Sequence, residues 1–205
     1  MLEVKDVSYQ YDHSKWLFKN LNLTIERGEI VGMCGKSGSG KTTLVKMIAG
    51  YLTPIEGKII IDGKKEDFRG VHPVQLIWQH PEKTINPKWK LIDVVREIDG
   101  FDKEIFDVLG IKRDWLYRRP HELSGGELQR FCIARAFGRE TRYIMADEIT
   151  SMFDAITQAQ IWHAMIRLVK EFNIGVLAIS HQIHLLKRIS DRLIDFNEIS
   201  NVRKH

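Results

Sequence analysis

The sequence predicts an α/β fold built around a mainly parallel sheet, with an antiparallel β part at the N-terminus and a helical insert. Three observations lead to this prediction. From residue 143 onward, short apolar runs alternate with amphipathic stretches of helical length, as in a parallel sheet covered by helices on both faces. The first 30 residues alternate apolar and polar side chains, as antiparallel strands do. Between about residues 80 and 140, apolar side chains recur at helical spacing.

The N-terminal alternation ends at residues 27–29, where Arg-Gly-Glu predicts a turn. Ile30–Cys34 is a short apolar run of the kind that forms a buried strand. A helix is expected over residues 42–48, with Gly50 near its C-terminal cap.

The remaining elements follow from the spacing of apolar residues. Further strands are expected at residues 57–64 and 74–78. In the helical insert, the apolar side chains at helical spacing are Leu91, Val94, Val95, Ile98, Ile105, Val108 and Leu109. After the insert the sequence predicts strands at 143–146, 176–179 and 193–196, and helices at about 157–172 and 184–189. A chain of 205 residues suits one domain, so we expect residues 1–205 to form a single domain that contains the insert.

The composition is that of an ordinary globular protein, with 43% hydrophobic and 28% charged residues. The 31 basic and 27 acidic residues are interspersed, so the net charge of +4 does not predict direct binding to nucleic acid. Cys34 and Cys132 lack metal-ligand spacing, which predicts two buried free thiols in a reduced compartment. The N-terminus is too charged for a signal peptide, and no apolar run approaches the roughly 20 residues that span a bilayer. We therefore expect a cytoplasmic protein without a membrane span of its own.

Residues 35–42 read GKSGSGKT and match the phosphate-loop pattern G-x-x-x-x-G-K-[ST] between a predicted strand and a predicted helix. Glycines let the loop turn its backbone N–H groups toward phosphate oxygens, and the following helix N-terminus favours an anion. Lys41 suits the β- and γ-phosphates of ATP, and the Thr42 hydroxyl suits Mg²⁺. The expected nucleotide-binding residues here are Gly35, Lys36, Ser37, Gly38, Ser39, Gly40, Lys41, Thr42 and Thr43.

The predicted strand at residues 143–146 is followed by two carboxylates, Asp147 and Glu148. At a strand end beside a phosphate loop, Asp147 can hold Mg²⁺ through water, and Glu148 can act as general base on the attacking water. Taken alone, two acidic residues at a strand end more often form a solvated turn. The phosphate loop about 100 residues upstream reverses that preference.

A second glycine motif, LSGGELQ at residues 123–129, precedes a further helical pattern. Ser124 and Glu127 have the spacing of a capping box, which begins a helix by satisfying its free N–H groups. A capped helix N-terminus with two glycines is also an anion site. The motif therefore predicts a structural cap that also binds phosphate.

Together, GKSGSGKT, LSGGE, YIMADE and the following Ser180 and His181 resemble the ATP-binding cassette (ABC) family, in the family's own order. The resemblance covers about residues 2–196, nearly the whole chain. It implies an ATPase that works as a head-to-tail dimer, with an identical copy or with a sister subunit. ATP on the phosphate loop of one subunit would be closed by residues 124–126 of the other, which gives two composite sites.

The resemblance also implies roles for single residues. Tyr11 matches the aromatic residue that stacks on adenine, with Tyr9 as the competing choice. Gln79 matches the glutamine that touches Mg²⁺ and the attacking water, and His181 matches the histidine that contacts the γ-phosphate. Asp154 belongs to the loop at 151–154, in the place of the family's loop that links the two sites. The implied catalytic residues are Lys41, Gln79, Glu148 and His181; the implied Mg²⁺ ligands are Thr42, Gln79 and Asp147; and the second nucleotide-binding segment contains Ser124, Gly125, Gly126 and Glu127.

Departures from the family pattern lie close to these residues. Ile149 replaces a proline, Met152 and Phe153 replace smaller residues, and Glu127 stands where glutamine is commoner. None of these changes removes a group that the chemistry needs, so we expect hydrolysis. The rate of hydrolysis and the communication between the two sites stay open.

Residues 79–89, QHPEKTINPKW, resemble the stretch Q-x-P-x-x-S-L-N-P-R of the oligopeptide, dipeptide and nickel importer ATPases, as do residues 120–122 and 131–136. Asn-Pro and His-Pro pairs also make turns in any protein. Members of this branch usually carry a longer C-terminal extension and a longer insert. The resemblance implies an importer subunit for peptide or nickel-type cargo, bound to integral membrane permease subunits at the inner face of the cell membrane.

Two alternatives stay open. A non-transport ABC ATPase would serve a cytosolic enzyme complex, such as the carbon–phosphorus lyase system, or nucleic acid or ribosomes. A nucleotide-binding regulator that hardly hydrolyses ATP would be compatible with Ile149 and the altered loop at 151–154. No residue of the sequence identifies the cargo.

Overall fold

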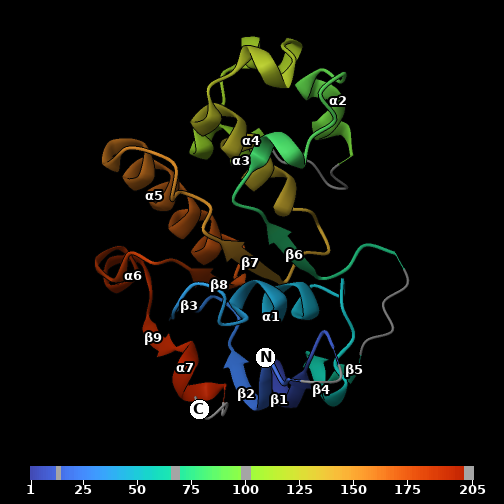
Figure 1. Ribbon diagram of the computed structural model, residues 1–205. Helices are drawn as coiled ribbons and strands as arrows, with labels where there is room; N and C mark the ends of the chain where they lie inside the picture. Colours follow the sequence, from blue (N-terminus) through green and yellow to red (C-terminus); the bar gives the residue numbers. More distant parts are fainter. Residues whose placement is uncertain (13–14, 66–69, 98–102, 201–205) are drawn as a thin grey trace.

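The structure is a computed structural model that describes residues 1–12, 15–65, 70–97 and 103–200 (Figure 1). Its centre is a five-stranded parallel sheet in the order β6-β7-β8-β3-β9. The strands are β3 (Ile30–Cys34), β6 (Val74–Ile77), β7 (Tyr143–Asp147), β8 (Gly175–Ile179) and β9 (Arg192–Asp195). Every residue of β7 and β8 is buried, because these central strands are covered on both faces. The predicted α/β fold with a mainly parallel sheet is confirmed.

A second sheet is antiparallel, has the order β2-β1-β4-β5, and lies below the parallel sheet in Figure 1. It contains β1 (Leu2–Tyr9), β2 (Phe18–Ile25), β4 (Glu56–Ile61) and β5 (Lys64–Lys65). The antiparallel strands predicted at the N-terminus are therefore confirmed as β1 and β2. The two strands that follow them in this sheet come from residues 56–65.

The prediction of a single strand at residues 57–64 is wrong for the second half of this range. The chain turns at Asp62 and Gly63, which have φ angles of 48° and 79°. It then returns as β5, with Ile61 opposite Lys64. Two central residues with positive φ make the tight hairpin turn for which Asp-Gly is a strong sequence signal.

Helices separate the two sheets and cover the parallel one. Helix α1 (Lys41–Ile48) lies between the sheets (Figure 1) and packs with apolar side chains of β1, β2 and β4. The fully buried apolar side chains of α1 are Leu44, Val45, Met47 and Ile48. A second core cluster contains side chains of the parallel sheet and of α4 (Gly125–Ala136), α5 (Ala155–Glu171) and α6 (Ile183–Ile189).

Between β6 and β7, the described residues contain helices and no strand, and they gather at the top of Figure 1. The elements are the 3₁₀ helices at Pro81–Lys83, Arg113–Tyr117 and Pro120–Glu122, and the α-helices α2 (Leu91–Arg96), α3 (Lys103–Leu109) and α4. Of the apolar residues predicted at helical spacing, Leu91, Val94, Val95, Ile105 and Leu109 are buried, Val108 is partly buried, and Ile98 lies outside the described residues. Phe106 of α3 packs edge to face on Phe131 of α4, with ring centroids 6.0 Å apart.

Helix caps explain two boundaries that differ from the prediction. Helix α5 begins earlier than expected because the Asp154 carboxylate accepts hydrogen bonds from two free N–H groups of the first turn. Strand β9 ends at Asp195, whose carboxylate caps the short helix α7 (Phe196–Ile199). The prediction of Phe196 as a strand residue is therefore wrong.

The two thiols differ in burial. Cys132 is buried, as predicted, but Cys34 is only partly buried because it lies at the end of β3, where the phosphate loop begins. Burial raises the pKa of both thiols. In the part of the chain that the structure describes, no helix combines the length and the apolar character that crossing a membrane requires.

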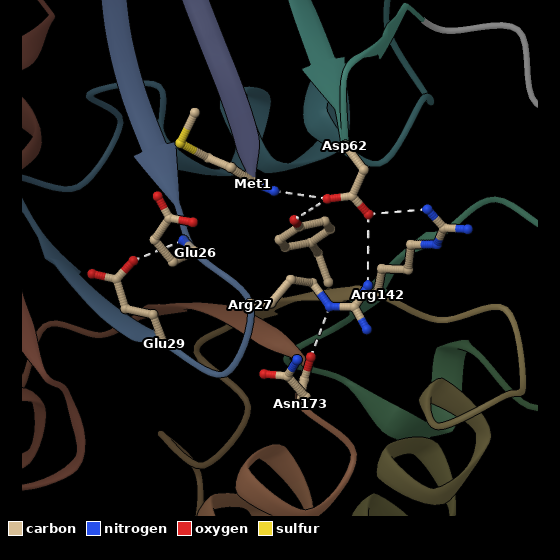
Figure 2. A network of polar contacts seen from close by, with 8 residues as sticks. Met1, Glu26, Arg27, Glu29, Asp62, Arg142 and Asn173 are labelled. Carbon is tan, nitrogen blue, oxygen red and sulfur yellow. Dashed lines mark hydrogen bonds and ion pairs between the residues drawn. The ribbon is translucent and has the colours of Figure 1, made fainter.

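A polar network joins the antiparallel sheet to the start of β7 (Figure 2). Asp62 accepts a hydrogen bond from the Tyr143 hydroxyl at 2.7 Å and lies 3.0 Å from the Arg142 guanidinium and 2.8 Å from the Met1 ammonium. Arg27 lies 3.6 Å from the same carboxylate. Burial alone would raise the pKa of Asp62, but the hydrogen bonds from Met1, Tyr143 and Arg142 lower it to about 2. The charged form of Asp62 therefore stabilises the contact between the two sheets.

Candidate active site

The phosphate loop connects β3 to α1 and contains three glycines with positive φ angles that other residues rarely adopt, among them Gly35 at 152°. Gly38 has a φ angle of 71°, and Gly40, which caps α1, has a φ angle of 112°. A side chain at position 40 would also meet Leu17 at 3.0 Å and Phe18 at 3.1 Å. The loop therefore fits beneath the β1–β2 connection only with glycine at position 40.

An open cavity of about 290 Å³ lies at the N-terminus of α1. It is lined by Tyr11, Leu17, Ser37, Gly38, Ser39, Gly40, Lys41, Thr42, Thr43, Asp147, Glu148 and His181. These residues come from the β1–β2 connection, the phosphate loop, the end of β7 and the segment after β8. The free N–H groups and the dipole of α1 favour an anion here.

Lys41 lies at the base of this cavity and is held by the loop itself. Its Nζ donates to the Gly35 carbonyl at 2.8 Å and to the Lys36 carbonyl at 2.7 Å. Burial lowers the pKa of Lys41, although the carboxylates of Glu148 and Asp147 act in the opposite direction. Gly35 and Lys36 themselves do not line the cavity. Their contribution in this structure is to hold the lysine.

Thr42 and Asp147 form the oxygen-rich corner of the cavity. The Thr42 hydroxyl donates to Asp147 Oδ2 at 2.8 Å, and burial raises the pKa of Asp147. Among the described residues, no cluster of three or more His, Cys, Asp or Glu side chains could hold a metal alone. Mg²⁺ commonly binds through one or two protein oxygens together with substrate phosphates. This pair therefore fits Mg²⁺ bound beside a nucleotide.

Glu148 and His181 face each other in the same cavity, with Glu148 Oε1 2.7 Å from His181 Nε2. The Glu148 backbone has a φ angle of 51°, which is uncommon for a residue other than glycine. Its N–H donates to the Ile179 carbonyl at 3.1 Å. The end of β8 thus fixes the Glu148 backbone, and the residues after β8 contact its carboxylate.

Gln79 reaches this site through a neighbour and does not line the cavity. Its Nε2 donates to Ser151 Oγ at 3.0 Å, and Ser151 Oγ donates to the Glu148 carbonyl at 3.0 Å. The structure therefore connects Gln79 to the Glu148 backbone in two steps. Gln79 therefore lies next to the cavity and is not one of its lining residues.

Tyr11 is the aromatic residue among those that line the cavity. Its hydroxyl lies 2.8 Å from Thr43 Oγ1, either atom being the donor, and its side chain is 64% exposed. Tyr9 packs against Phe18 and the edge of Tyr11 and does not line the cavity. Leu17, which the sequence did not indicate, lines the cavity beside Tyr11. It belongs to no recognisable motif, so no pattern could have found it.

The second glycine motif begins α4 as predicted. Ser124 Oγ accepts the Glu127 N–H at 3.3 Å, and the Glu127 carboxylate accepts the Ser124 N–H at 2.8 Å, so both halves of the capping box are present. Gly126 packs closely against α5, because a side chain there would meet Thr157 at 2.9 Å. A side chain at Gly125 would meet the Phe153 ring at 3.2 Å.

This motif lines a different cavity, of about 690 Å³. The cavity is lined by Gly110, Lys112, Trp115, Ser124, Gly125, Gly126, Glu127, Arg130, Met152, Phe153, Asp154, Thr157 and Gln160. Lys112, whose ammonium lies 5.5 Å from the Trp115 ring centroid, was not indicated by any motif. The lining residues of the two cavities do not overlap. One chain therefore carries the predicted nucleotide-binding residues in two separate places.

The first cavity has the groups that a nucleoside triphosphate requires. Ser39 Oγ is buried and has no hydrogen-bond partner among the described residues, which suits a phosphate oxygen as acceptor. Lys41, the α1 N-terminus and the Thr42–Asp147 pair are further groups that suit a triphosphate and its Mg²⁺. The fold and this site define a phosphate-loop nucleoside triphosphatase.

Comparison with known proteins identifies the family. Residues 18–151 match the family described as "ABC transporter". The oligopeptide transport ATP-binding protein OppF of Streptococcus mutans is 33% identical and covers 94% of this chain and 70% of its own length. The nickel import system ATP-binding protein NikE of Staphylococcus aureus is 30% identical over all of this chain and 95% of its own length. The chain belongs to the ABC transporter family.

Solved structures agree with this assignment. The ATP-binding cassette MJ0796, in a dimeric post-hydrolysis state bound to ADP and Pi, has a TM-score of 0.79 at 25% identity and covers 95% of this chain and 94% of its own. The chain is therefore an ABC ATPase, an enzyme that binds and hydrolyses ATP. Its similarity to the ATPases of oligopeptide, dipeptide and nickel transport, predicted from residues 79–89, is confirmed.

Proposed function

We propose that this ABC ATPase powers an importer by binding Mg-ATP and closing head to tail on a second ABC ATPase subunit. The observation that carries this proposal is the separation of the two cavities, each of which is lined by some of the expected residues. A rotation that places one chain's α4 N-terminus over the phosphate loop of another would complete two sites at once. In this proposal residues 1–205 act as one ABC ATPase domain, with the helical insert at about 80–140.

The phosphate loop holds the triphosphate. Lys41 exchanges its two loop carbonyls for β- and γ-phosphate oxygens, and the Ser39 hydroxyl gains the partner that it lacks. Mg²⁺, when bound, would neutralise phosphate charge, with the Thr42 hydroxyl, Asp147 and Gln79 as the groups that hold it. Tyr11 stacks on the adenine.

Hydrolysis is an in-line displacement at the γ-phosphorus. A bond forms between a water oxygen and phosphorus while the bond to the β–γ bridging oxygen breaks, and ADP and phosphate leave. The Glu148 carboxylate accepts the proton of the attacking water. His181, now 2.7 Å from that carboxylate, orients it and contacts the γ-phosphate. Gln79 would exchange its hydrogen bond to Ser151 for Mg²⁺ and the same water.

The second subunit supplies the N-terminus of its α4. Ser124 Oγ accepts the Glu127 N–H, so its own proton is free to donate to a phosphate oxygen across the dimer. Glu127 keeps its carboxylate on the Ser124 N–H, which leaves the cap intact while Gly125 and Gly126 approach the nucleotide. Asp154 caps α5 at the edge of this second cavity. The partner is an identical chain or a sister cassette.

The membrane partner is a pair of integral membrane permease subunits. Trp78, next to Gln79 in the chain, packs on Tyr51 with ring centroids 6.0 Å apart, and Tyr51 is 63% exposed. This aromatic pair, of which Tyr51 is the exposed member, is adjacent to the residue that acts on the attacking water, which suits a contact that reports permease conformation. The named relatives favour peptides or nickel-type cargo. The chain would then act in the cytoplasm at the inner face of the membrane, with no direct contact to nucleic acid.

The experiment that tests this proposal is a mild-detergent pull-down of the protein from its own cells, with the partners identified by mass spectrometry. Recovery of multi-span membrane subunits supports the importer, and their identity narrows the cargo. Recovery of only soluble enzyme or ribosomal components contradicts the importer and assigns the ATPase to a different machine.

A further inference from the structure

The turn that follows β7 holds Glu148 in an uncommon backbone conformation. Its φ angle of 51° persists only where the surroundings determine it, since most side chains avoid this region. The next residue is Ile149, and isoleucine does not fix the backbone as a proline ring would. Other contacts must therefore hold this turn.

A buried hydrogen-bond network on α5 provides those contacts. Thr150 Oγ1 accepts hydrogen bonds from Trp162 Nε1 at 3.0 Å and from Gln158 Nε2 at 3.1 Å. Gln158 Nε2 also lies 3.3 Å from the Thr150 carbonyl. Thr150 and Trp162 are each 3% exposed, and Gln158 is 9% exposed, so water cannot replace these bonds at low cost.

The network reaches Glu148 through the neighbour of Thr150. The Ser151 N–H and the Ser151 hydroxyl both donate to the Glu148 carbonyl, at 3.1 Å and 3.0 Å. On the other side, the Glu148 N–H donates to Ile179. The peptide groups on both sides of Glu148 are therefore fixed, one by β8 and one by a turn that is bonded to α5.

We propose that Thr150 is a positioning residue for ATP hydrolysis, which holds Glu148 in place through the Trp162 and Gln158 side chains. The buried Thr150 hydroxyl and the two donors on α5 thus connect the turn after β7 to a helix. The inference rests on the proposed role of Glu148 as general base. Loss of the network displaces the carboxylate, so it lowers kcat and leaves the phosphate loop and the binding of ATP unchanged.

The matched pair of variants is Thr150→Val and Thr150→Ser. Valine keeps the shape of threonine and removes the acceptor, whereas serine keeps the hydroxyl. Thr141→Val is the control, because Thr141 is also buried, at 6% exposure, and its hydroxyl has no partner among the described residues. The measurements are kcat and KM for ATP, and hydrogen–deuterium exchange of the peptide that covers residues 148–153.

Thr150→Val should lower kcat about tenfold to a hundredfold at unchanged KM, since a misplacement of about 1 Å costs roughly a hundredfold. Exchange in residues 148–153 should become faster in this variant alone. Thr150→Ser and Thr141→Val should stay within about threefold of the wild type, less than 1 kcal/mol in barrier. If Thr150→Val does not fold, Trp162→Phe removes one donor, keeps an aromatic ring, and should give the same pattern.

Wild-type kcat in the valine variant would overturn the inference, and so would an equal loss of kcat in the serine variant. A loss of kcat/KM that comes from a higher KM at unchanged kcat would also overturn it. Glu148→Gln, assayed in parallel, separates this result from the proposed mechanism. An active Glu148→Gln variant contradicts the mechanism itself. An inactive one beside an unimpaired Thr150→Val contradicts the positioning role alone.

Discussion

The Glu148 carboxylate lies 2.7 Å from His181 Nε2, while the Glu148 N–H donates to the Ile179 carbonyl. Both contacts come from β8 or the residues directly after it, so one buried strand fixes both the backbone and the side chain of Glu148. A group that is already positioned needs little reorganisation during the reaction. At the scale of single residues, turnover should therefore depend strongly on this carboxylate.

Replacement of Glu148 by glutamine should preserve ATP binding and abolish turnover. The amide has nearly the same shape but cannot accept the proton of the attacking water, so kcat should fall by about 10²- to 10⁴-fold. Phosphate release measures turnover, and titration with a fluorescent ATP analogue measures binding. Glu140→Gln, a change at an exposed carboxylate of the α4–β7 loop, should leave both unchanged. Normal hydrolysis by Glu148→Gln would remove Glu148 from the catalytic role.

The two tyrosines near the cavity make a second residue-scale prediction. Tyr11→Ala should weaken ATP binding about two- to tenfold, because an aromatic stacking pair is worth about 0.5–1.5 kcal/mol. Tyr11→Phe keeps the ring and loses only the contact of the hydroxyl with Thr43, so its affinity should stay close to that of the wild type. Equilibrium titration with ATP distinguishes the two. Unchanged affinity in Tyr11→Ala would show that Tyr11 does not stack on adenine.

At the scale of elements, the Asp62 network attaches the antiparallel sheet to β7, and its contribution to stability can be tested. The pKa of Asp62 is lowered from 3.8 to about 2, so its charged form stabilises the fold above pH 4, and this contribution is lost as the pH falls toward 2. Asp62→Asn should lower the free energy of unfolding by about 2 kcal/mol at pH 7. The difference from the wild type should shrink between about pH 4 and pH 2.

Urea unfolding of both proteins across this pH range measures the effect. Asp93→Asn is the control, because Asp93 is half exposed and its contact with Arg96, at 3.4 Å, lies on the surface of α2. Such pairs contribute about 0–1 kcal/mol. A loss in Asp62→Asn that is the same at pH 7 and pH 2 would mean that the carboxylate charge is not its cause.

The elements that were predicted correctly are those that local pattern determines. The strands at Ile30–Cys34 and after residue 143 were clear from their apolar runs, and the capping box at Ser124 was clear from spacing alone. The prediction failed where one short-range signal competed with another. Apolar residues 59–61 masked the Asp-Gly turn behind them, and an apolar Phe196 extended a strand that the Asp195 cap ends.

The candidate site shows a similar division. The phosphate loop, Asp147, Glu148 and His181 carry sequence motifs, and the structure brings them into one cavity. Leu17 and Lys112 enter their cavities only because distant segments approach each other in space, which no local pattern records. The position of Gln79 behind Ser151 likewise depends on the path of the loop after β7.

At the scale of the whole molecule, the main fact is that the predicted nucleotide-binding residues line two separate cavities. The loop at 151–154 connects them within one chain, since Ser151 contacts the Glu148 carbonyl while Phe153 packs beside Gly125. A movement of this loop would therefore change contacts at both cavities. In a head-to-tail dimer these cavities belong to different ATP molecules, so the loop connects one composite site to the other.

Mixing two inactive variants should therefore restore activity. Lys41→Ala removes the phosphate cation, and Ser124→Arg blocks the N-terminus of α4, so each variant alone should hydrolyse almost no ATP. A dimer of one copy of each contains one complete site and one doubly damaged site. Random pairing makes half of the dimers mixed, so an equal mixture should recover about a quarter of wild-type activity. A mixture as inactive as its components would mean that two copies of this chain do not share a site, and that its α4 closes over a different cassette.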